Sequence, residues 1–429
     1  MAAALEISPI RFYYRRQPGD GYERGHSVKE WPHRANSPTR SNSKNAKFMP
    51  KVSGFQFNRP QQLAAVLLLL LLAQCLWVFH RQTLTSRDYD FARCGREMWE
   101  KPDPLAGYFT TCGNLPDGAL GYRMAGLPLT LQRVLAGQAA DTSTWEMRHE
   151  LGYVLVLLHS GFLLTGIILG GALWWVTRRL YGNPGGFIAL ALYCFSPAVI
   201  HACTYPNNEI LTAFGLFASL YTAMGVAHAM QGPPRKWRSR IVLLTLTLAF
   251  TAASHVAAFL LALLLSIGLM AYLAVGRRAY IVPIMMAASI GTLLLVFASY
   301  DFSLDAFSYF FRSGAGRIGF SLEPARQWFL SLSHSAVTLA AVTALLLYLP
   351  TRRSRYFGNT VPLLLALLFF FLITPGISSE PTLWALPFLL TFIAGVFADF
   401  LETRYRRVFL AMTGCLLALQ VTLSLLSLP

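Results

Sequence analysis

Long apolar runs alternate with polar connections along most of this 429-residue chain. The first run covers 63–79, and ten more follow at about 151–176, 186–203, 209–230, 241–254, 257–275, 281–299, 331–350, 360–374, 382–400 and 408–427. A helix needs roughly 20 predominantly apolar residues to cross a bilayer. The pattern therefore predicts an all-α protein, a polytopic membrane bundle of about 11 transmembrane helices. The stretch 241–275 also allows a re-entrant pair around His255 instead of two crossings.

Positive charge marks alternate connections between these runs. The connections around Tyr205, His255 and Gly376 contain no Lys or Arg. Basic residues gather instead in every other connection: Arg178 and Arg179; Arg235, Lys236, Arg238 and Arg240; Arg277 and Arg278; Arg352, Arg353 and Arg355; Arg404, Arg406 and Arg407. Cytoplasmic loops of membrane proteins carry such an excess. The pattern predicts a multi-pass protein of the plasma (inner) membrane, with a cytoplasmic N-terminus and an extracytoplasmic C-terminus.

Composition agrees with this assignment, because 55% of the residues are hydrophobic and only 13% are charged. The net charge of +16 would suggest a nucleic-acid partner in a soluble protein. Here membrane topology explains it, so we expect the lipid bilayer and no nucleic acid as a partner. We expect three regions: a flexible basic cytoplasmic tail at 1–60, a transmembrane core at 61–350 and C-terminal transmembrane helices at 351–429.

Two polar segments on the predicted outer side, 80–150 and 300–331, are too long to be simple connectors. Loops beyond about 12–15 residues are usually functional or disordered, and the aromatic residues here favour order. Leu127–Leu135 is typical of a short amphipathic helix at a membrane interface. Together the two segments suggest a cleft that opens to the outer face. Cys94 and Cys112 share the first segment and could form a disulfide in an oxidising compartment.

Asp88 and Asp90 follow the first apolar run directly and are the strongest candidates for chemistry. A general base must reach a substrate hydroxyl and be ionised when it does so. A carboxylate at the outer mouth of a membrane cleft meets both needs, and acids beside membrane spans are uncommon. The alternative is a solvated segment that starts a helix, where Asp is frequent. On this stretch alone the two interpretations stay open.

Other polar residues could bind a substrate on the same side. Guanidinium groups bind phosphate in a bidentate manner, although interfacial arginines more often face lipid headgroups. The candidates for substrate binding are Arg123, Arg312, Arg317, His201, Asn208 and Glu209. His159 and His255 lie inside apolar runs, where an ionisable residue often has a functional role. They are explained equally well as neutral side chains that form hydrogen bonds between helices. The sequence contains no P-loop, Rossmann unit, HExxH or GxSxG motif, so nucleotide hydrolysis and dinucleotide redox chemistry lack support.

Three stretches resemble the polytopic GT-C glycosyltransferases, the class that contains polyprenyl-phosphate-mannose protein mannosyltransferases and aminoarabinose transferases. The first is the acidic motif Asp88-Tyr89-Asp90, which continues as FARCGREMW. The second is the Pro-containing segment Tyr122–Leu135, and the third is Ala172–Tyr221, where a basic–Gly turn precedes an apolar run that ends in Ser-Pro. The usual acidic pair is an adjacent Asp-Glu, whereas Tyr89 separates the two acids here.

The resemblance implies an inverting transfer of a sugar from a polyprenyl-phosphate-linked donor to an extracytoplasmic acceptor. Asp88 or Asp90 would then deprotonate the acceptor hydroxyl, and an arginine would hold the leaving phosphate. Some members use a divalent metal and others do not, so the resemblance leaves the cofactor open, and the residues suggest no metal ligands. The alternatives are a transporter or flippase for a lipid-linked glycan, or a non-catalytic membrane scaffold.

Overall fold

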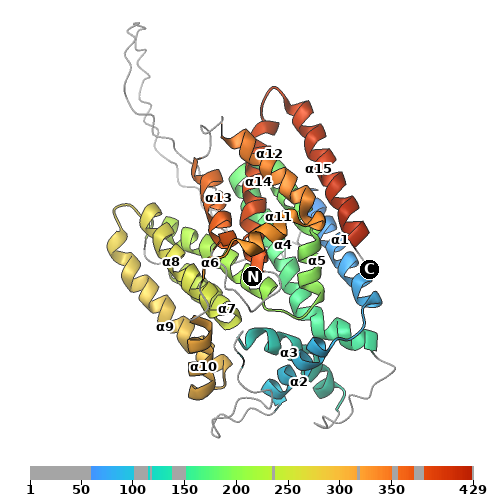
Figure 1. The fold of residues 1–429 in the computed structure, drawn as a ribbon. Coiled ribbons are helices and arrows are strands. Elements are labelled where there is room, and N and C mark those ends of the chain that lie inside the picture. Colours follow the sequence, from blue (N-terminus) through green and yellow to red (C-terminus); the bar gives the residue numbers. More distant parts are fainter. Residues whose placement is uncertain are drawn as a thin grey trace, which may run out of the picture. The chain divides into compact units, whose positions relative to one another are not determined.

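The computed structural model describes residues 59–100, 115, 118–137, 151–233, 237–315, 319–349, 356–371 and 381–427, and in this part of the chain all regular elements are helices (Figure 1). The α-helices are α1 (Arg59–Arg81), α2 (Ser86–Glu100), α3 (Leu120–Leu135), α4 (Leu151–Cys194), α5 (Pro197–Thr204), α6 (Glu209–Ala229), α7 (Arg238–Ser254), α8 (Val256–Leu273), α9 (Ile281–Ser299), α10 (Leu304–Ala315), α11 (Glu323–Leu330), α12 (Ser335–Tyr348), α13 (Tyr356–Phe371), α14 (Leu386–Leu401) and α15 (Arg406–Ser427). Short 3₁₀ turns precede α9, α12 and α14. The predicted tail at 1–60 falls almost wholly outside the described residues.

The all-α prediction is confirmed, and every predicted apolar run is largely helical. Six of the described helices are long and apolar enough to cross a membrane, and the apolar helices ending at Tyr348, Phe371 and Leu401 are shorter. The protein is therefore a multi-pass membrane protein. The figure of 11 crossings and the orientation of the termini stay predictions. The doubtful stretch 241–275 forms two helices, α7 and α8, that meet at His255.

The second and third apolar runs do not form one continuous helix. The backbone of α4 breaks first at Gly182, whose φ of 80° suits glycine because it lacks a Cβ. The helix then ends at Cys194, and α5 begins at Pro197, which has no N–H to continue the ladder. Two glutamines from other helices satisfy the freed carbonyls: Gln74 Nε2 donates to Cys194 O at 3.2 Å, and Gln420 Nε2 donates to Phe195 O at 2.7 Å.

The core is built around helices that are apolar on every side. Every residue from Leu386 to Ala398 on α14 is buried, with α4, α12 and α13 packed around it. A helix that is hydrophobic all round belongs in the interior of a bundle. By contrast, α1, α9 and α15 bury only one stripe and expose many apolar side chains, as expected where lipid is the solvent.

Helices α2 and α3 lie side by side at one end of the bundle (Figure 1). They cross where two glycines meet: a Cβ on Gly95 would lie 2.2 Å from Tyr122 O, and a Cβ on Gly126 would lie 2.1 Å from the Gly95 carbonyl carbon. The helix predicted at Leu127–Leu135 is present and begins earlier, at Leu120. Its apolar side chains Leu127, Leu131, Val134 and Leu135 are exposed. This is the amphipathic pattern that the sequence predicted.

Candidate functional site

Asp88 lies in the first turn of α2, and its side chain is fixed by Thr85. Both the backbone N–H and the hydroxyl of Thr85 donate to Asp88 Oδ2, at 2.7 and 2.6 Å. In return, the Asp88 N–H donates to Thr85 Oγ1 at 3.3 Å. This reciprocal arrangement is a capping box, and the carboxylate also favours the positive end of the helix dipole. Asp88 is therefore built into the start of α2.

The other oxygen of the Asp88 carboxylate meets a histidine from the membrane bundle. His159 Nε2 lies 2.8 Å from Asp88 Oδ1, and the two side chains are 1% and 2% exposed. An ionised carboxylate only accepts hydrogen bonds, so Nε2 carries the proton. The imidazole also stacks on Phe79, with ring centroids 5.2 Å apart. The pair thus links α2 to α4 and to the C-terminal end of α1.

Opposing effects act on the pKa of Asp88. Burial raises the pKa, because it penalises the charged form. The hydrogen bonds from His159 and Thr85 stabilise the charged form, and they outweigh burial, so the net pKa lies below its usual 3.8. The carboxylate is consequently ionised at neutral pH, although it is shielded from water.

Asp90 occupies the opposite face of the same helix. Two residues apart on an α-helix differ by about 200° in direction, so both acids cannot point the same way. Asp88 faces the bundle, whereas Asp90 and Tyr89 are exposed. The two aspartates that the sequence presents as a pair are therefore in unlike surroundings.

Arg123 ties the two predicted outer segments together. Its Nη2 donates to Asp301 Oδ2 at 2.7 Å, and its Nε donates to the Ser299 carbonyl at 2.7 Å. The guanidinium also lies over the Trp99 ring, 5.0 Å from the centroid. Asp301 and the next residue, Phe302, have positive φ values of 51° and 60°, a conformation that non-glycine residues rarely adopt. Arg123 thus holds the strained turn between α9 and α10 against α2 and α3.

A second ionic cluster joins α2 to α3. The Glu100 carboxylate accepts hydrogen bonds from Arg96, Arg133 and the Thr130 hydroxyl, and its side chain is 2% exposed. Cys94 on the same helix is buried and disulfide-bonded. Cys112, the partner that the sequence suggests, lies outside the described residues. The contacts of Glu100 therefore fix α2 against α3.

The remaining predicted binding residues are placed in different surroundings. His201 is exposed on α5 and stacked on Tyr205, with ring centroids 4.3 Å apart. Asn208 and Glu209 are buried at the start of α6. The Asn208 amide oxygen lies against Gly121 of α3, where a Cβ would be only 2.1 Å away.

The second predicted outer segment contains the two remaining candidate arginines. Arg312 is exposed on α10, and Arg317 lies outside the described residues. Among the residues that the structure describes, no three His, Cys, Asp or Glu side chains are grouped so as to hold a metal ion. The oxygens of Asp88 already bind Thr85 and His159. These residues therefore give no basis for assigning a role to a divalent metal.

Comparison with solved structures identifies the architecture. ArnT from Cupriavidus metallidurans, an aminoarabinose transferase, superposes with a TM-score of 0.51 at 14% identity, over 82% of this chain and 63% of ArnT. The oligosaccharyltransferase of Archaeoglobus fulgidus in its apo form gives a TM-score of 0.56 at 12% identity, over 86% of this chain and 56% of that enzyme. Both have the GT-C fold. This chain has the GT-C fold.

The comparisons that find the GT-C fold are comparisons of structure. No protein-family model matches the sequence, and no curated protein matches it either. The chain spans between about half and two thirds of the length of the GT-C proteins that it resembles. The resemblance expected from Asp88-Tyr89-Asp90 and the two stretches after it is confirmed at the level of the fold.

The structure connects two further residues, Thr85 and His159, to Asp88, and sequence reasoning missed the first of them. Thr85 could have been found, since Thr-x-x-Asp before a helix is a capping-box signal. For His159 the sequence predicts a hydrogen bond between helices as one interpretation, and that bond is confirmed. Its partner could not be read from the sequence, because Asp88 and His159 are far apart in the chain.

Proposed function

We propose that this protein transfers a sugar from a polyprenyl-phosphate-linked donor to an acceptor hydroxyl at the extracytoplasmic face of the plasma membrane. The GT-C fold supports the reaction class, because the fold neighbours are membrane glycosyltransferases. The positive-inside pattern supports the location, because it puts α2 and α3 on the outer face. The observation that carries the proposal is the buried, ionised Asp88 at the membrane end of α2.

Asp88 is the proposed general base, and His159 is the proposed positioning residue. The Nε2–H of His159 holds one carboxylate oxygen, so the other is directed toward Thr85. Thr85 is exposed, and its hydroxyl donates to Asp88 Oδ2. We infer that an acceptor hydroxyl takes the place of the Thr85 hydroxyl at this oxygen and gives up its proton there. Proton transfer to a positioned base contributes roughly 10²–10⁴-fold to rate.

The remaining polar groups fit a lipid-phosphate donor. Arg87 lies in the first turn of α2 and His201 lies on α5, and both side chains are exposed. Two donors of this kind suit the leaving phosphate, since guanidinium and imidazole both bind phosphate oxygens. Arg123 has the opposite character, because Asp301 and Ser299 already engage its guanidinium. We therefore propose that Arg123 holds the turn between α9 and α10 against α2 and α3.

The extracytoplasmic glycans of cells that lack the chain provide the test. The lost or altered glycan should be identified by mass spectrometry and restored by the wild-type gene. Asp88→Asn should fail to restore it while the protein inserts in the membrane at wild-type levels. Asp90→Asn, on the exposed face of α2, should restore it. Full restoration by Asp88→Asn would overturn the proposed base and favour a structural role for the capping box, as in a non-catalytic scaffold.

A further inference from the structure

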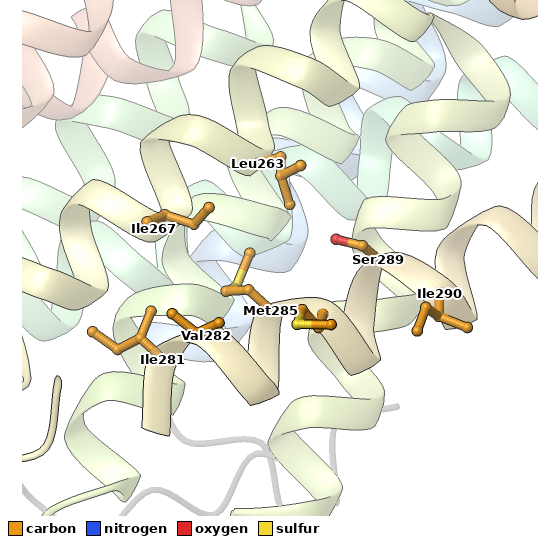
Figure 2. Close-up of a pocket in the computed structure, with 8 residues that line it drawn as sticks. Leu263, Ile267, Ile281, Val282, Met285, Ser289 and Ile290 are labelled. Atoms are coloured by element: carbon orange, nitrogen blue, oxygen red, sulfur yellow. The ribbon is translucent and has the colours of Figure 1, made fainter. Parts of the chain in front are cut away.

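A groove of about 300 Å³ runs between α8 and α9. Its walls are almost wholly apolar. Figure 2 shows Leu263 and Ile267 of α8 facing Met285 and its neighbours on α9. The lining residues are Leu263, Ile267, Ile281, Val282, Met285, Met286, Ser289 and Ile290.

The length of the groove matches one leaflet of a membrane. From Ile281 to Ile290 the lining follows α9 for nine residues, which is about 14 Å at the rise of an α-helix. Half of a bilayer's hydrocarbon core is about 15 Å thick. One end of the groove lies at the connection between α8 and α9, and the other lies near the middle of α9. An acyl chain of one leaflet therefore fits it from end to end.

The connection at the end of the groove is strongly basic. Arg277 and Arg278 lie four and three residues before Ile281, and no Asp or Glu occurs between Glu209 and Asp301. Within the part of the chain that the structure describes, no carboxylate forms an ion pair with either arginine. Arg277 lies over Trp237, 5.8 Å from the ring centroid, and Arg278 Nε donates to the Ala271 carbonyl. The terminal N–H groups of both arginines can therefore donate hydrogen bonds to an anion.

Aromatic residues place this connection at the headgroup level. Tyr280, next to the arginines, is 50% exposed and packs edge-on against Trp237, with centroids 5.4 Å apart. Tyr272, at the end of α8, is 59% exposed. Tyr and Trp are enriched at membrane interfaces, and basic pockets between spans bind anionic headgroups. The apolar groove thus continues into a cationic, interfacial mouth.

We propose that this groove binds an anionic phospholipid, with one acyl chain between α8 and α9 and the phosphate on Arg277 and Arg278. The site is independent of the proposed sugar transfer and lies on elements that do not carry Asp88. Charge complementarity selects an anionic headgroup, and the one-leaflet length selects a phospholipid chain over a much longer polyprenyl chain.

Native mass spectrometry of the delipidated full chain in detergent tests the site. The probes are phosphatidylglycerol and phosphatidylcholine with identical acyl chains, and undecaprenyl phosphate. The wild type should bind phosphatidylglycerol on the order of 10-fold more tightly than phosphatidylcholine. The variant Arg277→Gln/Arg278→Gln should lose one bound lipid and this preference, whereas the control Arg404→Gln/Arg407→Gln should keep both.

A second pair of variants tests the groove without touching the arginines. Met286→Trp should fill the groove and weaken the binding of both phospholipids to the same extent. The control Leu294→Trp is similarly exposed on α9 but lies outside the lining, and it should leave binding unchanged. Equal binding of the two phospholipids by the wild type, preferential binding of undecaprenyl phosphate, or equal loss in test and control variants would each overturn the proposal.

Discussion

The carboxylate of Asp88 and the imidazole of His159 lie 2.8 Å apart, and both are almost fully buried. One belongs to the first turn of α2, and the other lies within the membrane-spanning α4. The carboxylate is held charged by hydrogen bonds on both oxygens, in surroundings that would otherwise favour its neutral form. This relationship makes Asp88 both the anchor of α2 and the proposed base.

The stability of the protein should depend on the ionisation of Asp88. The folded pKa lies below the usual 3.8, so the ionised carboxylate contributes stability that is fully present above that value. This contribution is lost as the pH falls through the folded pKa. Thermal unfolding in detergent between pH 6 and pH 3 should show a falling Tm for the wild type. Asp88→Asn should have a lower Tm at pH 6 and a flatter profile, and Asp90→Asn should follow the wild type.

The crossing of α2 and α3 should not tolerate a methyl group. A Cβ at Gly95 or Gly126 would lie within about 2.2 Å of backbone atoms of the other helix, which cannot move aside as a flexible side chain can. Gly95→Ala should therefore destabilise the protein by about 2 kcal/mol, within the range for overpacking. Gly268→Ala, on α8, is the matched control, because a Cβ there would meet no atom within 4 Å outside its own helix turn. Equal stability of the two variants would contradict this account of the crossing.

Arg123 and Asp301 should be energetically coupled. Their side chains are 11% and 22% exposed and lie 2.7 Å apart, and hydrogen bonds to charged groups contribute about 1.5–3 kcal/mol. Arg123→Gln and Asp301→Asn should each destabilise the protein, and the double variant should cost less than the sum. A double-mutant cycle on chemical unfolding measures the coupling. The exposed pair Arg326 and Glu323, 3.9 Å apart, should show none.

The break between α4 and α5 should depend on Gln420. Its buried side-chain amide donates to the carbonyl of the half-buried Phe195, and leaving a buried acceptor unsatisfied costs about 1–3 kcal/mol. Gln420→Leu should therefore lower the thermal stability in detergent, although leucine is the more apolar residue. An increase in stability for Gln420→Leu would show that the glutamine does not support the break.

The fold could be predicted from the sequence because its signals are local. Apolar runs of membrane length and alternating arginines require no knowledge of tertiary contacts, and the predicted runs are largely helical. The division of Asp88 from Asp90 was also within reach, since two residues on one helix point in opposite directions. Asp88 and Asp90 are taken for a pair only if the helix that begins after Thr85 is not recognised in the sequence.

The pairing of distant residues was beyond the sequence. Nothing in the segment around His159 names Asp88 as its partner, and nothing around Arg123 names Asp301. The sequence offers Arg123 as one of several candidate phosphate ligands, although interfacial arginines more often face lipid headgroups. Its actual surroundings depend on the fold that brings the end of α9 against α3, which only the three-dimensional structure reveals.

Sugar transfer by the purified chain tests the central claim most directly. The protein would be reconstituted in liposomes with the polyprenyl-phosphate-linked sugars and the acceptor fraction of its own cells, and product formation would be followed by mass spectrometry. The wild type should transfer sugar, and Asp88→Asn should lower the rate by about 10²-fold or more at unchanged insertion. Asp90→Asn should stay near the wild-type rate. Equal rates for wild type and Asp88→Asn would contradict the assignment of Asp88 as the base.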